Sequence, residues 1–112
     1  MAMSKKSLFE PFEVDLSVVC KALGHPARIK ILKILLAKND QTCQEIVDKL
    51  PLSQSTVSQH LSELRNAQLI KGTNHKTSVI YSVDKEYLAK SQKMLGDLFY
   101  AHILNVKQTT LF

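Results

Sequence analysis

The spacing of apolar residues along the first half of the chain predicts three successive helices. The first is expected over residues 16–23, with Asp15 as its N-cap, and Gly24 ends it. The second begins at Pro26 and is apolar over more than half of its girth, so we expect it at the centre of the core. The third is expected over residues 43–49.

A fourth helix follows the third after a very short connection. Thr42 and Glu45 have the spacing of a capping box at the start of the third helix. Pro51 ends that helix, so only Leu52 precedes Ser53, the expected cap of the next one. Two short helices joined by about four residues form the helix-turn-helix pattern, whose second helix ends here near residues 66–68.

The period of the apolar positions changes from helical to alternating after the fourth helix. Residues 69–73 and 77–83 predict two strands joined by a polar tip at residues 74–76, an arrangement typical of a wing. A last helix is expected over residues 85–106, capped by Asp84. Its apolar stripe is longer than a chain of 112 residues can cover, so we expect a partner subunit to cover it.

The order of elements defines the expected fold class and domain organisation. It is a mainly α fold with a small β-hairpin, a winged helix-turn-helix of order α-α-α-α-β-β-α. One domain is expected over residues 15–106, with an N-terminal arm at residues 1–14 and a C-terminal tail at residues 107–112. No signal peptide or membrane span is expected, because apolar runs are short, and the cytoplasm is the expected compartment.

The exposed positions of the fourth helix carry hydroxyls and amides where an ordinary surface helix carries Lys, Glu and Ala. Hydroxyls and amides pair with base edges and phosphate oxygens, so this helix is predicted to lie in a DNA groove. The candidate DNA contacts on the helix are Gln54, Ser55, Thr56, Ser58 and Gln59. Ser55 could instead only cap the helix, and Thr56 could turn toward the preceding helix.

The charge of the chain is compatible with a polyanionic partner. Fifteen Lys and Arg against ten Asp and Glu give a net charge of +5. In the wing, Lys71, His75 and Lys76 could contact phosphate or the minor groove, although a solvated hairpin tip is the alternative. Arg28 could contact phosphate or pair with an acid to hold the fold, and His60 is expected to be a partly buried helix residue.

Three stretches of sequence occur in an order that points to a known family. They read KALGHPARIKIL at residues 21–32, LSQSTVSQHLSEL at residues 52–64, and AQLI at residues 67–70 followed by VIYSV at residues 79–83. Together they resemble the ArsR/SmtB family of bacterial winged-helix repressors. The resemblance implies a homodimer paired through the first and last helices, an operator of two similar half-sites, and repression until an effector releases the protein.

The same resemblance places four residues at positions where family members touch DNA. They are Gln54, Ser55, Ser58 and Gln59. The leading hypothesis is therefore a dimeric, sequence-specific DNA-binding transcriptional regulator that represses and is released by an effector.

Metal sensing is not predicted, although the family includes metal sensors. Its arsenic and lead sensors carry two cysteines one residue apart at the start of the third helix, where this chain has only Cys43. Its zinc sensors place an Asp and a His two residues apart in the last helix, with a second His eleven residues on; here His102 follows Tyr100 and has no His partner in that helix. Zinc requires about four ligands, so we expect no metal site and no cofactor.

The two cysteines do not identify the effector that would release the protein from DNA. Free cysteine is among the most buried residue types, so Cys20 and Cys43 are expected to be core thiols. The alternative is a redox switch between them, which requires Cα atoms within about 7 Å. The possible effector is thus a small molecule or an oxidant.

Two other classes of function compete with DNA binding. A winged-helix protein-interaction module without DNA binding is the alternative, because Arg65 is the only basic residue of the fourth helix and Glu63 balances it. An enzyme is not predicted, because the chain shows no nucleophile–base–acid pattern and no glycine-rich phosphate loop.

Overall fold

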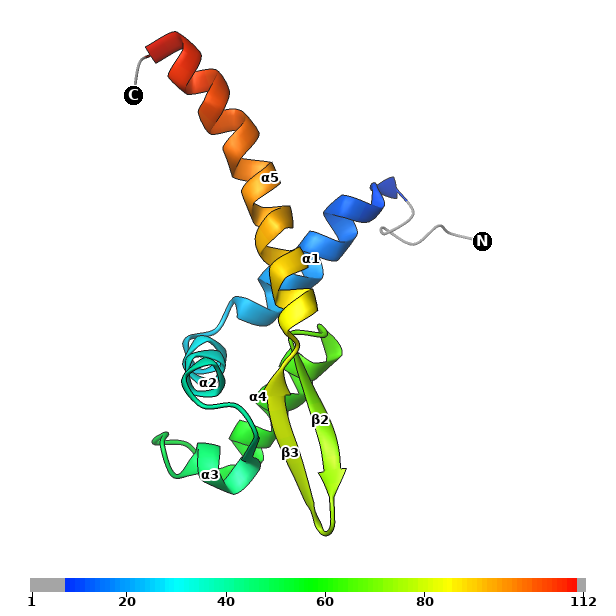
Figure 1. Ribbon diagram of the computed structural model, residues 1–112, viewed down its shortest axis with the longest axis vertical. Coiled ribbons are helices and arrows are strands. Elements are labelled where there is room, and N and C mark those ends of the chain that lie inside the picture. The colour runs from blue at the N-terminus through cyan, green and yellow to red at the C-terminus, as the bar shows by residue number, and fades with distance from the viewer. Residues whose placement is uncertain (1–7, 111–112) are drawn as a thin grey trace.

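A computed structural model describes residues 8–110, with side chains described for residues 8–100, and its described part is a winged helix-turn-helix (Figure 1). The helices are α1 (Pro11–Leu23), α2 (Pro26–Ala37), α3 (Cys43–Val47), α4 (Gln54–Asn66) and α5 (Lys85–Thr110). The strands are β1 (Gln41–Thr42), β2 (Ile70–His75) and β3 (Ser78–Val83). The predicted order of helices and of the wing is confirmed, and β1 is an additional element.

The first helix begins earlier than its sequence pattern predicts. The expected cap, Asp15, lies inside α1, which starts instead at Pro11. Glu13 Oε1 accepts a hydrogen bond of 3.1 Å from the backbone N–H of Glu10 and so satisfies one of the free amides at this end. The predicted boundary between arm and domain, at residue 15, therefore falls within a helix. At the other end, α5 continues to Thr110 through part of the predicted tail.

The helix-turn-helix starts at the predicted caps. Thr42 Oγ1 accepts from the N–H of Glu45 at 3.2 Å, and Glu45 Oε1 accepts from the N–H of Thr42 at 3.0 Å, which completes the capping box. Ser53 Oγ accepts from the N–H of Thr56 at 3.3 Å at the start of α4. Helix α3 ends at Val47, before the predicted residue 49.

The wing belongs to a three-stranded antiparallel sheet of order β1-β3-β2. Its register runs from Ile70 opposite Val83 to His75 opposite Ser78, so β2 is longer than predicted. In the short strand β1, Gln41 pairs with Tyr81. A strand of two residues leaves no alternating pattern in the sequence, which is why β1 was not predicted.

The core lies where the first four helices meet the base of the wing. The predicted seam of α4 is buried there, since Val57, Leu61 and Leu64 are fully inaccessible. Ile31 and Leu35 of α2 are equally inaccessible, which confirms the central position of that helix. No described helix is both long and apolar enough to cross a bilayer.

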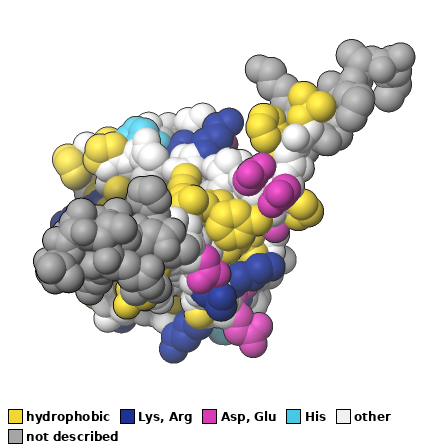
Figure 2. Space-filling view, turned by 90° about the horizontal axis from the view of Figure 1, so that it is seen from above, with side chains coloured by type: hydrophobic (Ala, Val, Ile, Leu, Met, Phe, Trp, Pro, Cys, Tyr) yellow, Lys and Arg dark blue, Asp and Glu magenta, His cyan; other side chains and the backbone are white. Residues whose placement is uncertain are grey.

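A set of large apolar side chains stays exposed around α1 and α5, which pack against each other. Figure 2 shows hydrophobic side chains gathered on this end of the molecule. We call this set the α1/α5 apolar face; it comprises Leu8, Phe9, Val18, Leu98, Phe99 and Tyr100. Its exposure agrees with the prediction that the stripe of the last helix exceeds what one chain can cover.

Candidate nucleic-acid interface

Helix α4 presents two chemically different faces. Its apolar seam enters the core, and the side chains of Gln54, Ser55, Ser58 and Gln59 are exposed on the other side. Gln54 and Ser58 are four residues apart, as are Ser55 and Gln59, so the four form two adjacent rows on the first two turns. Among the described residues, Gln54, Ser58 and Gln59 have no side-chain hydrogen-bond partner, so their amides and hydroxyl are available to a ligand.

The other two hydroxyls at the start of α4 belong to its cap. Ser53 Oγ donates to Thr56 Oγ1 at 2.9 Å and lies 3.2 Å from Ser55 Oγ. The side chain of Thr56 is half-buried, whereas Ser55 is exposed. Thr56 is therefore occupied in holding the helix start, and Ser55 combines a place in this cap with an accessible hydroxyl.

A hollow beside the start of α4 brings it together with α3 and the wing. Gln54 lines it together with Gln44 of α3 and Ser78 of β3. Both of these additional side chains are exposed and polar, and no motif in the sequence marks them. Only the folded arrangement makes them neighbours of Gln54, because the three residues come from separate elements of the chain.

The tip of the wing carries two of the predicted wing residues. His75 and Lys76 are both exposed there, and Lys76 has a backbone φ of 56° that allows the tight turn between the strands. In Figure 1 the tip lies at the end of the molecule opposite the free end of α5. The tip is thus free to approach a nucleic acid together with the start of α4.

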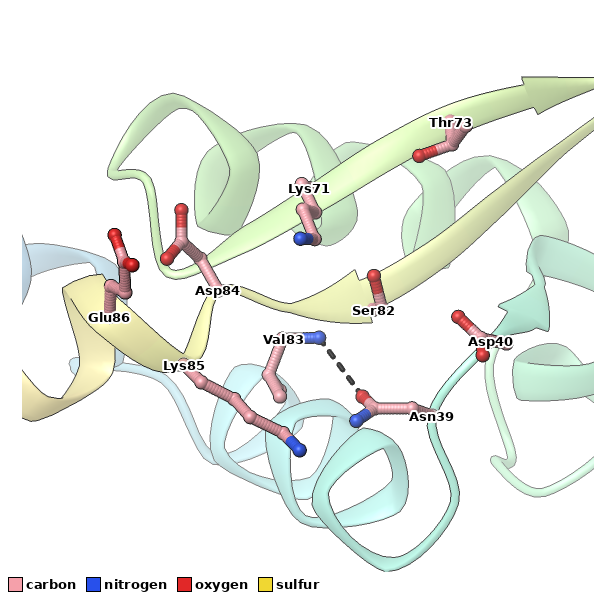
Figure 3. Close-up of a pocket in the computed structure, with 9 residues that line it drawn as sticks. All are labelled: Asn39, Asp40, Lys71, Thr73, Ser82, Val83, Asp84, Lys85 and Glu86. Carbon is pink, nitrogen blue, oxygen red and sulfur yellow. Dashed lines mark hydrogen bonds between the residues drawn. The ribbon is translucent and has the colours of Figure 1, made fainter.

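The third predicted wing residue, Lys71, lies elsewhere. It stands opposite Ser82 near the base of the wing, four residues from His75 along β2, which is roughly 13 Å at about 3.3 Å per residue. Figure 3 shows its side chain in an open pocket beside Asp84, and Asp40 and Glu86 also line that pocket. Lys85 lines the pocket as well, and Lys71 lies at the base of the wing, so the structure does not group it with the cations of the tip.

Among the described residues, Arg28 does not pair with an acid, one of its two predicted partners. Instead of an acid, its Nε donates to Nδ1 of His60 at 3.1 Å, and its Nη1 donates to the backbone carbonyls of Lys21 at 3.3 Å and Ala22 at 3.4 Å. His60 is buried, as predicted. Desolvation lowers the pKa of His60, and the neighbouring His25 and Arg28 lower this pKa further.

The cysteines differ from the expected pair of core thiols. Cys20 is exposed on α1, so this expectation is wrong for it, and Cys43 is half-buried at the start of α3. Desolvation raises the pKa of the Cys43 thiol. Both thiols are free. Within the described part of the chain, no three His, Cys, Asp or Glu side chains are grouped to hold a metal ion, and His102 lies outside the described side chains.

Sequence comparisons assign this chain to a known family. Residues 25–71, from the cap of α2 to the first part of β2, match the family described as bacterial regulatory protein, arsR family. An HTH-type transcriptional regulator of Methanocaldococcus jannaschii is 35% identical over 81 residues, which cover 71% of this chain and 90% of the relative. The transcriptional repressor PagR of Bacillus anthracis is 30% identical over 84 residues, which cover 75% of this chain and 84% of PagR.

A solved structure agrees with this assignment. HlyU from Vibrio cholerae, described as a transcriptional activator, superposes with a TM-score of 0.66 at 30% identity, over 81% of this chain and 98% of HlyU. These relatives are named as transcriptional regulators, and the fold of HlyU matches the winged helix-turn-helix described above. The chain therefore belongs to the arsR family of bacterial regulatory proteins and is a winged helix-turn-helix transcriptional regulator.

Proposed function

We propose that this protein is a cytoplasmic homodimer that binds a specific duplex DNA operator and represses transcription until an effector releases it. The observation that carries the proposal is the exposed face of α4. Three of its side chains, Gln54, Ser58 and Gln59, are accessible and unpaired among the described residues, while the opposite face is fixed in the core. A helix fixed in this way presents its polar groups in one orientation, as base reading requires.

Each exposed group has a role that its chemistry supports. A Gln amide can pair with adenine through two hydrogen bonds, so Gln54 and Gln59 are the proposed base readers. Ser58 suits either a base or a phosphate, and Ser55, held by the cap, suits a phosphate. His75 and Lys76 at the wing tip suit the backbone or the minor groove. Lys71 and Thr56 remain predicted contacts, and their surroundings give them less support.

The α1/α5 apolar face is the proposed dimer interface. Phe99 and Tyr100 are each more than half exposed, and aromatic side chains of this size are typical of buried interface cores. Pairing through helices at the end opposite the wing tip leaves both copies of α4 free for two half-sites of one operator. Occupation of a promoter by such a dimer would exclude other proteins from that DNA, which is the proposed basis of repression.

The interacting DNA can be found without knowing the operator in advance. Selection from a random duplex library by the full chain should yield a pseudo-palindrome, whose affinity falls steeply with salt. Gln54→Ala should weaken binding to the selected duplex by about 1–3 kcal/mol and relax the preference at one position, while binding to random DNA stays the same. Gln92→Ala, on an exposed part of α5, is the matched control and should do neither.

A substitution that removes one charge tests whether the wing tip contacts phosphate. Lys76→Ala should weaken binding to the selected duplex and to random duplexes to a similar extent, because a phosphate contact carries no sequence information. Lys93→Ala removes the same charge from α5, where the side chain forms only an exposed ion pair with Asp97, and should have little effect. Failure of the library to yield any enriched sequence would reject DNA reading in favour of a protein-interaction module.

A further inference from the structure

A single guanidinium connects three helices at the point where α1 ends. Arg28, in the first turn of α2, donates to the carbonyls of Lys21 and Ala22 at the end of α1 and to His60 in the middle of α4. Both carbonyls lie in the last turn of α1, and that of Lys21 also accepts a hydrogen bond of 3.2 Å from the N–H of Gly24. Arg28 therefore joins a helix of the proposed dimer interface to the recognition helix.

The contact between Arg28 and His60 requires a particular protonation state. Arg28 Nε can only donate, so Nδ1 of His60 must be unprotonated, and the neutral ring must carry its proton on Nε2. The ring of His25 lies 4.4 Å from that of His60, and its own Nδ1 accepts from the N–H of Ala27 at the start of α2. Both rings thus present a bare Nδ1 to a donor.

The surroundings of His60 oppose a positive charge. From α2 it faces His25 and Arg28, and from its own helix it faces Glu63, the one acid whose charge favours the protonated ring. The guanidinium of Arg28, which binds His60, also binds the carbonyl of Lys21 at the end of α1. Protonation of His60 would set a donor against the donor of Arg28 and add a like charge.

We propose that Arg28 is a positioning residue for the recognition helix, and that its contact with neutral His60 makes operator binding sensitive to acid. This inference rests on the proposed function, since it concerns the same α4. His60 follows the proposed base reader Gln59 directly, so a shift of α4 at this contact moves the reading face. Because Arg28 also binds the end of α1, the same shift changes the position of α4 relative to a dimer partner.

The first test is a pH profile of affinity for the selected duplex, between about pH 5.5 and 8 at constant ionic strength. The Kd of the unmodified protein should rise as pH falls, approaching roughly tenfold per pH unit below the pKa of His60, the limit for one linked proton. His60→Asn keeps an acceptor near the position of Nδ1 but does not titrate, so its profile should lack this rise. Parallel profiles for the two proteins would overturn the inference.

The second test is Arg28→Lys, which conserves charge and removes the fork that reaches three acceptors. Affinity for the selected duplex at pH 7.5 should fall by about tenfold, while affinity for random DNA, which depends on charge, should change much less. An unchanged affinity for the selected duplex would refute the positioning role. Lys30→Arg, at an exposed position of the same helix, is the control for exchanging these two side chains.

A third measurement does not depend on DNA. Long-range nitrogen–proton correlation spectra of the imidazole rings at pH 7.5 should show His60 neutral, with its proton on Nε2. A proton on Nδ1 would contradict the hydrogen bond with Arg28 and overturn the inference even if the protein binds DNA. Absence of any selected operator would instead reject the proposed function, so the two failures are distinguishable.

Discussion

Gln41 gives the most detailed stability prediction, because its buried side chain has three resolved hydrogen bonds. Its Nε2 donates to the carbonyl of Lys38 at 2.6 Å and to that of Ile34 at 3.2 Å, and its Oε1 accepts from Lys49 Nζ at 2.6 Å. These bonds join the end of α2 to β1 and to the segment after α3. Gln41→Met keeps the length of the side chain and removes all three bonds, and Gln41→Glu removes only the donor.

The magnitude follows from what each partner retains. The carbonyl of Ile34 keeps a hydrogen bond of 3.1 Å from the N–H of Lys38, and the exposed Lys49 regains water, so the main loss is the bond to the Lys38 carbonyl. Such a loss costs about 1–2 kcal/mol in Gln41→Met. Gln41→Glu should cost more, about 2–4 kcal/mol at neutral pH, because a buried carboxylate then faces two carbonyl oxygens.

Urea unfolding followed by circular dichroism, at one fixed protein concentration, measures both variants. The buried carboxyl in Gln41→Glu should have a raised pKa, so the folded state takes up a proton and this variant regains stability as pH falls from 7.5 to 5. Gln92→Glu, which places the same charge on an exposed part of α5, should show no such recovery. If Gln41→Glu is at least as stable as Gln41→Met at pH 7.5, the account of these hydrogen bonds is wrong.

Four further predictions concern the core, the cap of α3 and the cysteines. Leu61→Ala, at a fully inaccessible position, should lower the free energy of unfolding by about 2–5 kcal/mol, and a loss under about 1 kcal/mol would contradict its place in the core. Thr42→Ala should cost about 1 kcal/mol through the lost cap of α3 in the same unfolding assay. The hydrogen bond from the Thr42 N–H lowers the pKa of Glu45, so the cap should weaken as acid protonates that carboxylate, a dependence that Glu45→Gln should lack in unfolding measured against pH. In Cys20→Ser, the remaining Cys43 should react with a thiol reagent more slowly than glutathione at pH 8, because burial raises its pKa; equal rates would contradict this.

The sequence predicted those elements whose signals are local. The capping box of Thr42 and Glu45, Pro26 at the first position of α2, and Ser53 before α4 each act within one turn of helix, and all three are confirmed. The start of α1 was predicted wrongly because Asp15 looks like a cap in sequence. The structure uses Pro11 at the first helical position and the carboxylate of Glu13 instead.

The features that the sequence did not predict depend on distant partners. Arg28 and His60 are 32 residues apart, and no spacing rule connects them. The spacing of Cys20 from the other apolar residues of α1 predicts a buried side chain. It lies at the edge of that apolar stripe, however, and is exposed. Lys71 belongs to the predicted wing, but only the fold shows that it lines a pocket together with Asp40 of the α2–β1 connection and Glu86 of α5.

The pairing of β1 with β3 separates the segment that carries the proposed DNA contacts from the part that carries the proposed dimer interface. Gln41 and Thr42 pair with Tyr81 and Ile80, so the chain between them, which includes α3, α4 and β2, forms one excursion closed at its two ends by this pairing. That excursion contains every proposed contact with DNA, whereas the α1/α5 apolar face lies wholly outside it. Mutations of exposed residues within the excursion can therefore change which DNA is bound, and mutations on the α1/α5 apolar face can change how two copies pair. The contact between Arg28 and His60 joins these two parts of the chain, so a change in one part could alter the position of the other there.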